Sequence, residues 1–353
     1  MSGLLRKLAY LAAIVFAALQ AISLAAAGSV TDSAGRAVSV PERVEKVFAA
    51  GAPASVLVYV LAPDMLTGWP RALRIEEKPY VTPAVRELPE LGMLTGRGGS
   101  ANLETVLRVK PDVIIDFGSV RDTFVSLADS VQAQTAIPYL LIDGRLDATA
   151  SSLRLLGAAI GRRERAEKLA QYVETRLSGI AAAVRDVEPG RRPKVYLARG
   201  PDGLESGVAG SINTEIIERA GGRNVIEADA GRKGLVRVSM EQILLADPDV
   251  VVTWDRGFYE RAQNDPLWSG VRAVREGRLY LSPVLPFGWI DRPPSLNRLM
   301  GLIWLAKLFY PDRFKTDLRE SVREFYALFY HVDLADAELD RLMPWTPEKT
   351  SRP

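Results

Sequence analysis

Hydrophobic and polar positions follow two rhythms along this chain, one typical of short buried strands and one typical of amphipathic helices. The clearest helical pattern covers 161–187, where apolar residues such as Leu169, Val173 and Leu177 recur at spacings of three and four between charged ones. A helix of this length would span roughly 40 Å at about 1.5 Å per residue, more than the width of one small domain. The pattern predicts either a strut between two domains or an ordinary long helix within one.

The chain before this helix shows strands that alternate with helices. After a small hairpin at 30–40, we expect strands at 44–49, 66–69, 113–117 and 139–142, and helices at 54–61, 102–109, 124–135 and 149–160. The Pro- and Gly-rich segment 74–99 is expected to be mostly loop with short helical turns. Alternation of this kind predicts a parallel sheet that is covered on both faces.

The same pattern starts again after the long helix. We expect strands at 194–198, 250–254 and 278–281, and helices at 211–220, 240–246, 296–309 and 318–330. The last residues, which contain three prolines, are expected to form a tail.

An internal repeat links the two halves. Residues 102–115 align without a gap on 239–252, at one offset of 137, and the alignment pairs Glu104 with Glu241. Solenoid units are far shorter than this spacing, so the repeat predicts two similar α/β domains. A helix–Pro–Asp–strand junction also recurs by chance in many α/β proteins, which is the alternative interpretation.

The N-terminus has the pattern of a cleavable secretory signal over 1–27. Arg6 and Lys7 precede an apolar run, and three alanines end at Ala27. An uncleaved membrane anchor is the alternative, although the run is near the lower limit for a span. The chain has no Cys, and so it has neither disulfides nor a lipoprotein cysteine. We therefore expect a soluble periplasmic protein that is not a lipoprotein.

Charge and residue usage exclude several functional classes. Removal of the leader would leave 43 basic and 43 acidic residues, a neutral balance that argues against nucleic-acid or anionic-membrane binding. His331 is the only histidine, so no Ser-His-Asp, Cys-His or His-rich metal site can be built. The Gly-rich stretch 96–99 lacks the spacing of a phosphate loop. Carboxylate dyads remain possible, but nothing places two together, and we expect no enzyme.

A cleft between two α/β lobes is the expected ligand site, lined by the loops that follow the strands. Arg and Trp are over-represented in those loops, and together they suit an anionic organic ligand or a metal chelate. Each residue has the alternative role of a surface charge or a core aromatic. The candidate ligand-binding residues are Trp69, Arg71, Arg97, Arg199, Trp254, Arg256, Tyr259, Trp289, Asp291 and Arg292.

Four stretches carry a resemblance to a known family: the two repeated segments 102–115 and 239–252, together with 155–170 and 289–306. They resemble the periplasmic substrate-binding proteins of the iron-siderophore, haem and cobalamin class of ABC importers, and the similarity extends from Thr31 to about Tyr330. The resemblance implies two Rossmann-like α/β lobes with parallel sheets joined by one long helix. On this chain we place the lobes at 28–160 and 189–338, the joining helix at 161–188 and a tail at 339–353. The resemblance also implies modest closure on the ligand.

The resemblance further implies delivery of cargo to an inner-membrane ABC permease and its ATPase, with Glu104 and Glu241 at the positions that dock on permease arginines. A helix N-terminal acid that favours the helix dipole is the alternative role of both. Where the first helix of such proteins often carries a Glu, this chain has Ala54 and Ser55. Haem-binding members use an axial His or Tyr, and here the Tyr candidates are Tyr59, Tyr80 and Tyr259.

We therefore predict a monomeric receptor without a cofactor of its own that captures a metal chelate, with a ferric siderophore as the first choice. The alternatives of the same class are cobalamin, haem, and an oxyanion such as molybdate or tungstate. The alternative of another class is a secreted enzyme or an extracytoplasmic sensor domain on the same two lobes.

Overall fold

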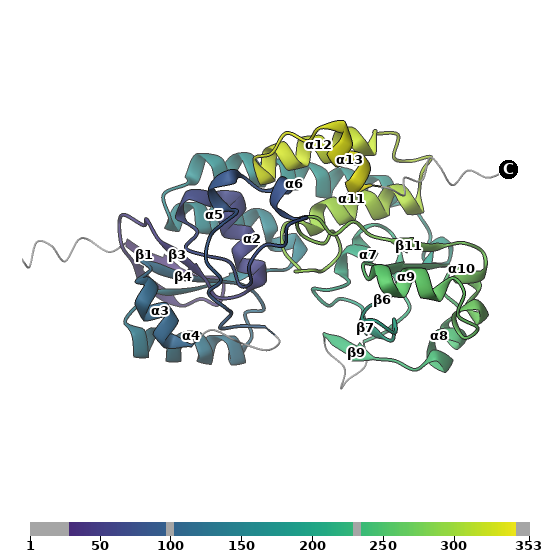
Figure 1. Ribbon diagram of the computed structural model, residues 1–353, viewed down its shortest axis with the longest axis horizontal. Coiled ribbons are helices and arrows are strands. Elements are labelled where there is room, and N and C mark those ends of the chain that lie inside the picture. Colours follow the sequence, from purple (N-terminus) through teal and green to yellow (C-terminus); the bar gives the residue numbers. More distant parts are fainter. Residues whose placement is uncertain (1–27, 97–101, 229–233, 344–353) are drawn as a thin grey trace, which may run out of the picture.

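The computed structural model describes residues 28–96, 102–228, 234–343, and it shows two lobes beneath a layer of helices that spans both (Figure 1). The predicted leader at 1–27 lies outside the described residues, and its cleavage stays a prediction. Each lobe contains its own parallel sheet. The α/β class with two lobes and parallel sheets, predicted from the alternation of strands and helices, is confirmed.

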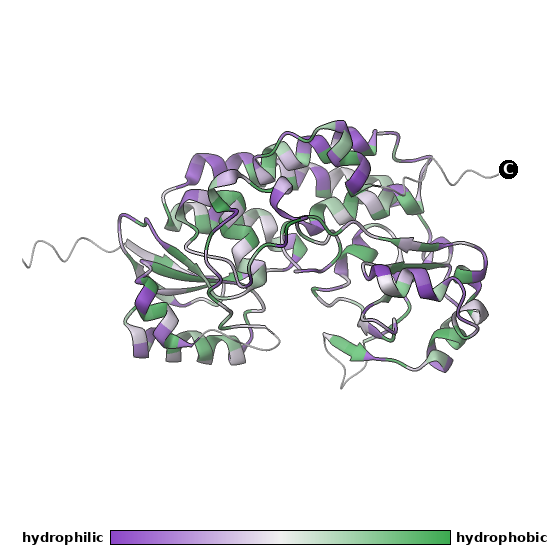
Figure 2. Cartoon of the chain, in the orientation of Figure 1, coloured by the Kyte–Doolittle hydropathy of each residue, from purple (hydrophilic) through white to green (hydrophobic). Residues whose placement is uncertain are grey.

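The sheet of the N-terminal lobe has the order β3-β4-β5, with all strands parallel. Its strands are β3 (Val47–Ala49), β4 (Val113–Gly118) and β5 (Tyr139–Asp143), and the lobe's helices are α2 (Ala52–Leu61), α3 (Leu103–Val109), α4 (Asp122–Thr135) and α5 (Thr149–Ala159). Figure 2 shows these strands as mainly apolar, because helices cover both faces of the sheet.

Outside this sheet, the predicted hairpin forms from β1 (Gly28–Thr31) and β2 (Ala37–Val40), paired antiparallel. The predicted strand at 66–69 is wrong, since Leu66 and Trp69 make only isolated bridges to Val47 and Glu90. The segment 74–99 contains the short helical turns η2 (Lys78–Tyr80) and η3 (Pro83–Val85).

The C-terminal lobe has a sheet of order β11-β10-β6-β8, again parallel throughout, and a separate antiparallel pair. The sheet strands are β6 (Lys194–Ala198), β8 (Arg223–Asn224), β10 (Val250–Thr253) and β11 (Leu279–Leu281), and the pair is β7 (Glu205–Gly207) with β9 (Leu235–Arg237). Its helices are α7 (Glu215–Arg219), α8 (Met240–Ala246), α9 (Arg256–Ala262) and α10 (Arg272–Arg275). The sequence pattern did not predict β7, β8, β9, α9 or α10.

The long helix is α6 (Arg163–Val184), and its apolar stripe is buried as predicted, including Leu169 and Val173. It belongs to the layer over both lobes together with α11 (Arg298–Phe309), α12 (Leu318–Phe325), the π-helical turn η7 (Tyr326–Tyr330) and α13 (Asp336–Leu342) (Figure 1). The predicted start of the tail at 339 is wrong, because α13 continues to Leu342 and buries both Leu339 and Leu342.

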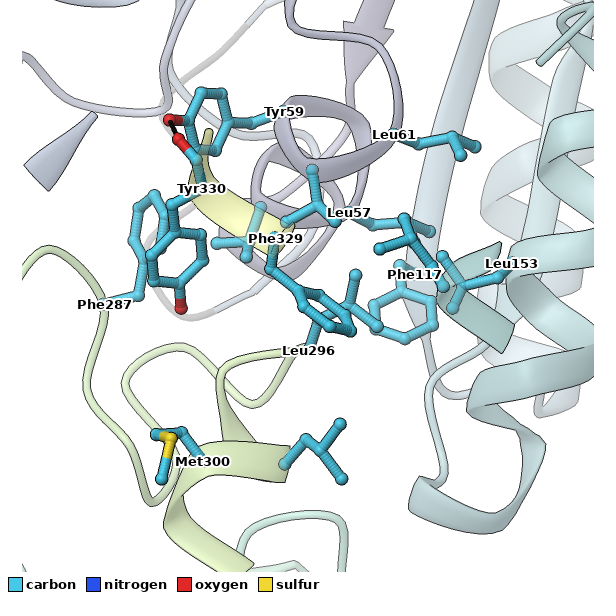
Figure 3. Packing of buried hydrophobic residues seen from close by; sticks show 14 of the residues in the cluster. Leu57, Tyr59, Leu61, Phe117, Leu153, Phe287, Leu296, Met300, Phe329 and Tyr330 are labelled. Atoms are coloured by element: carbon cyan, nitrogen blue, oxygen red, sulfur yellow. Dashed lines mark hydrogen bonds between the residues drawn. The ribbon is translucent and has the colours of Figure 1, made fainter. Parts of the chain in front are cut away.

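Aromatic side chains join this layer to the lobes. Tyr59 of α2 donates a hydrogen bond to the carbonyl oxygen of Tyr330 at 2.5 Å, and its ring lies 6.2 Å from that of Phe287 (Figure 3). His331 directly follows the turn η7, and its Nε2 lies 2.9 Å from Nη2 of Arg165. The histidine therefore has a structural environment between α2 and α6.

The repeat predicted from the sequence extends to the helix caps. Asn102 accepts a hydrogen bond from the Thr105 amide, and Ser239 accepts one from the Gln242 amide, so each caps the N-terminus of its helix. At the other end of these two helices, Lys110 and Asp247 both adopt the left-handed conformation, with φ of 50° and 44°.

The repeated aspartates also have matching roles. Asp112 accepts hydrogen bonds from the amides of Glu45 and Lys46, at the start of β3, at 2.7 and 2.8 Å. Asp249 accepts one from the Lys194 amide, at the start of β6, at 2.8 Å. Each aspartate thus joins the beginning of its own strand to the beginning of the neighbouring parallel strand, as expected for duplicated units.

A buried arginine ties the two lobes together beneath the helical layer. The Arg298 side chain is 1% exposed, pairs with Glu215 of α7, and donates to the carbonyl oxygens of Gly144 in the N-terminal lobe and Ile212 in the C-terminal lobe. Glu215 in turn accepts a hydrogen bond from the Leu146 amide at 2.8 Å. This network holds the loop after β5 against α7.

The buried carboxyl group of Asp116 makes stability depend on pH. Burial raises the pKa of Asp116 to about 6, although Thr95 and Tyr139 donate to it at 3.1 and 3.3 Å. Because the folded state favours the neutral form, the native state loses stability as the pH rises from about 4 to about 6. Asp116→Asn is therefore expected to increase the free energy of unfolding by about 1–3 kcal/mol at pH 7.5 and to leave it nearly unchanged at pH 4.

Urea unfolding at the two pH values measures this difference. The matched control is Asp312→Asn, since Asp312 is exposed and its replacement is expected to change the free energy of unfolding by less than about 0.5 kcal/mol at either pH. An Asp116→Asn protein that is equally destabilised at both pH values would contradict the prediction.

Candidate ligand-binding site

A cavity of about 210 Å³ lies between the lobes. The start of α2 and the loop 69–77 line it from the N-terminal lobe, and the loop 284–293 lines it from the C-terminal lobe. The start of α2 follows β3 and the loop 284–293 follows β11, so both lie at the carboxyl ends of parallel strands, where open α/β sheets bind ligands. The cavity is therefore the candidate ligand site.

Two arginines of the N-terminal loop are held by one buried carboxylate. Arg71 donates to both oxygens of Glu77 at 2.6 and 2.8 Å, and Arg74 donates to Oε1 of the same group at 2.8 and 3.0 Å. The Glu77 side chain is 1% exposed. Burial alone would raise the pKa of Glu77, but the hydrogen bonds from both arginines outweigh it and the pKa lies below its ordinary value. Glu77 therefore stays ionised and fixes two exposed guanidinium groups at the cavity.

A third guanidinium approaches from the other lobe. Arg292 stacks on Trp254, with its guanidinium carbon 4.7 Å from the ring centroid. Partial burial, followed by the positive charges of Arg74 and Arg71, lowers the pKa of Arg292. Among the described residues, no carboxylate forms an ion pair with it. Three guanidinium groups therefore line the cavity: Glu77 pairs with Arg71 and Arg74, Glu76 also pairs with Arg74 at 3.2 Å, and Arg292 is left to favour an anion.

The orientation of Trp254 is set by Asp291, a buried carboxylate that also lines the cavity. Asp291 accepts hydrogen bonds from Nε1 of Trp254 at 2.8 Å and from Asn213 at 3.0 Å, and Nε of Arg199 lies 2.8 Å from its Oδ2. Burial raises the pKa of Asp291, and Arg199 opposes this effect. Arg199 also pairs with Glu205. In the free protein, Arg199 and Asp291 therefore position Trp254, and Trp254 supports Arg292.

The N-terminus of α2 adds a further positive partial charge. Ala52, Ser55 and Val56 of this helix line the cavity. A Cβ atom on the N-cap residue Gly51 would lie 2.7 Å from Oγ1 of Thr95, so only glycine fits there. The dipole of this ten-residue helix favours an anion at its N-terminus, in agreement with the arginines.

The remaining predicted ligand residues have different environments. Trp69 lines the cavity and donates from Nε1 to the Val85 carbonyl at 2.8 Å. Arg256 pairs with Glu260 along α9 at 3.8 Å and borders a separate hollow. Tyr259 packs against the core of the C-terminal lobe.

Trp289 requires a correction, and Arg97 cannot be placed. Trp289 is fully buried and donates to the Tyr326 hydroxyl at 3.3 Å, so it is a core residue and does not line the cavity. Arg97 lies outside the described residues. The sequence analysis missed Arg74 and Glu77, although the spacing Arg71-x-x-Arg74-x-x-Glu77 in a loop was a signal that could have identified them.

Comparisons with known proteins give the family of this chain. A family described as "Periplasmic binding protein" matches residues 52–284. The chain belongs to this family. It is a substrate-binding protein of an ABC importer, and such proteins partner with a permease and an ATPase. The family consists of binding proteins, in agreement with the expectation that the chain is not an enzyme. Among the described residues, every helix is too short or too polar to cross a bilayer.

Three similar proteins illustrate the range of the family. The molybdate-binding protein MolA of Haemophilus influenzae is 26% identical over 86% of this chain and 91% of its own length. A solute-binding protein of an ABC transporter from Sulfurospirillum deleyianum is 30% identical, with a TM-score of 0.81 over 90% of this chain and 99% of its own. A cobalamin-binding protein of Halobacterium salinarum is 32% identical over 45% of this chain and 42% of its own.

Proposed function

We propose that this protein captures a divalent oxyanion, such as molybdate or tungstate, and delivers it to an ABC permease. The observation that carries the proposal is the convergence of Arg71, Arg74 and Arg292 on one cavity, where Glu77 pairs only with the first two. Because Arg292 forms no ion pair among the described residues, its positive charge is available to an anion. The similarity to the molybdate-binding protein over most of both chains supports this cargo.

An anionic ferric chelate is the second candidate, and the apolar wall of the cavity favours it. Trp69, Pro286 and Phe287 present apolar surface beside the arginines. A bare oxyanion gains little from such a wall, whereas the organic part of a siderophore would pack against it. Both candidates place negative charge against the same three guanidinium groups.

Calorimetric titration of residues 28–353 against molybdate, tungstate, sulfate, a ferric tris-catecholate, a ferric tris-hydroxamate, haem and cobalamin tests the proposal. We expect submicromolar dissociation constants for molybdate and tungstate, with weaker binding of sulfate. Tight binding of a ferric chelate, without binding of molybdate or tungstate, would favour the second candidate. Chemical turnover of a bound compound would contradict both and support the enzyme alternative.

We further propose that Glu104 and Glu241 dock on the permease. Both are exposed in the first turn of their helices, at matching positions of the repeat. Glu104→Ala with Glu241→Ala is expected to lower uptake of the cargo at least about tenfold by removing two ion pairs, with an unchanged ligand dissociation constant. Uptake assays in cells, together with calorimetry on the purified variant, measure the two quantities.

The matched control replaces Glu164 and Glu320 by Ala. They too are exposed acids in the first turns of helices, but α6 and α12 belong to the layer on the opposite side of the molecule from α3 and α8 (Figure 1). The control is expected to transport normally. Equal losses of uptake in both double variants would contradict the docking role.

A further inference from the structure

We propose that Leu107 and Leu244, one on the tip of each lobe, make apolar contacts with the permease next to the docking glutamates. This inference rests on the proposed function, because it assumes that the α3 and α8 tips meet a permease. It assigns a second, uncharged part to the interface.

The two leucines are equivalent positions of the repeat. Each follows its glutamate by three residues, at Glu104–Leu107 on α3 and Glu241–Leu244 on α8, so each pair lies on one helix face. Their exposed fractions are 47% for Leu107 and 44% for Leu244. Because the caps of both helices also match, the two lobes present the same pair of side chains in the same local geometry.

The position of the two helices indicates the kind of partner. Both α3 and α8 lie on the side of the molecule away from the helical layer, α3 on the N-terminal lobe and α8 on the C-terminal lobe (Figure 1). Two equivalent surfaces of this kind fit a partner with two equivalent faces, which is a two-fold symmetric dimer. A carboxylate beside an exposed leucine suits a face that carries a cation beside an apolar side chain.

The α8 tip carries the larger apolar surface. Leu245 is 87% exposed and Leu267 is 66% exposed, and Cδ2 of Leu244 lies 3.3 Å from the position of a Cβ atom on Gly270, three residues after Leu267. At the position of the repeat that corresponds to Leu245, the N-terminal lobe has Arg108. The C-terminal tip is therefore expected to contribute more apolar contact than the N-terminal tip.

The test measures binding of the full mature chain to its permease–ATPase complex in nanodiscs. Leu107→Ser with Leu244→Ser is expected to weaken this binding at least about tenfold, with an unchanged ligand dissociation constant and unfolding temperature. The matched control, Leu107→Met with Leu244→Met, keeps apolar side chains and is expected to bind within about twofold of the unmodified chain. Leu245→Ser alone is expected to weaken binding more than Leu107→Ser alone.

Salt separates the leucine contacts from the charged ones. The loss caused by the serine variants is expected to be the same at about 50 mM and about 500 mM NaCl, whereas the loss caused by Glu104→Ala with Glu241→Ala shrinks at high salt. Unweakened permease binding by the serine variants would overturn the proposal. The proposal would also be overturned if sedimentation showed that the leucines join two copies of this chain and their replacement left permease binding unchanged. If the unmodified chain does not bind the permease at all, the proposed function fails and this inference with it.

Discussion

Replacement of Arg292 by glutamine is expected to weaken binding of the anionic ligand about 100-fold, equivalent to about 2.8 kcal/mol. Arg292 supplies the guanidinium from the C-terminal lobe, and among the described residues it forms no ion pair that the ligand would have to displace. Its charge is therefore available to the ligand, and charge-assisted hydrogen bonds to an anion are lost with it. Titration calorimetry of the variant against the preferred ligand measures the change.

The same replacement is expected to leave the ligand-free protein as stable as before, or slightly more stable. In the empty cavity Arg292 faces Arg71 and Arg74, and loss of its charge relieves this repulsion. Thermal unfolding without ligand measures that effect. The matched control is Arg256→Gln, since Arg256 pairs with Glu260 outside the cavity and its loss is expected to change affinity less than about twofold. Equal effects of the two replacements on affinity would contradict the proposed site.

Replacement of Arg298 by methionine is expected to reduce the free energy of unfolding by about 3–5 kcal/mol. The change leaves Glu215 without its buried counter-charge and frees the carbonyl oxygens of Gly144 and Ile212. Because these groups belong to both lobes, the contact between the lobes is weakened as well. Urea unfolding of the ligand-free variant measures the loss.

A surface pair provides the control for this prediction. Arg313 pairs with Asp186, two residues beyond the end of α6, and Arg313→Met is expected to leave the free energy of unfolding nearly unchanged. A loss below about 1 kcal/mol for Arg298→Met would show that the buried network does not hold the lobes together.

Periodicity predicted the parts of the fold that have enough residues to show a period. The buried stripe of α6 and the repeated helix–strand units were predicted because each contains several apolar positions at regular spacing. Strands β7, β8 and β9 contain three, two and three residues, too few for a pattern, and pairing with neighbours determines them. The residues around Trp69 have the composition of a strand, but Trp69 makes only one isolated β-bridge, to Glu90.

The candidate site was harder to predict, because loop geometry decides which charges are available. Arg199 and Arg292 are both arginines in loops after strands, yet Arg199 is paired with Glu205 and Asp291 while Arg292 faces the cavity. Trp289 precedes Asp291 by two residues and points into the core. Such partners come from segments distant in sequence, and composition cannot reveal them.

The most direct test of the account is the position of the metal atom in crystals of the protein grown with tungstate. We predict an anomalous difference peak for tungsten between the lobes, about 4–5 Å from the guanidinium nitrogens of Arg71, Arg74 and Arg292, since each would donate hydrogen bonds of about 2.8 Å to a tungstate oxygen. A fully occupied tungsten peak away from these three residues, or an empty cavity at saturating tungstate, would contradict the assignment of this cavity as the oxyanion site.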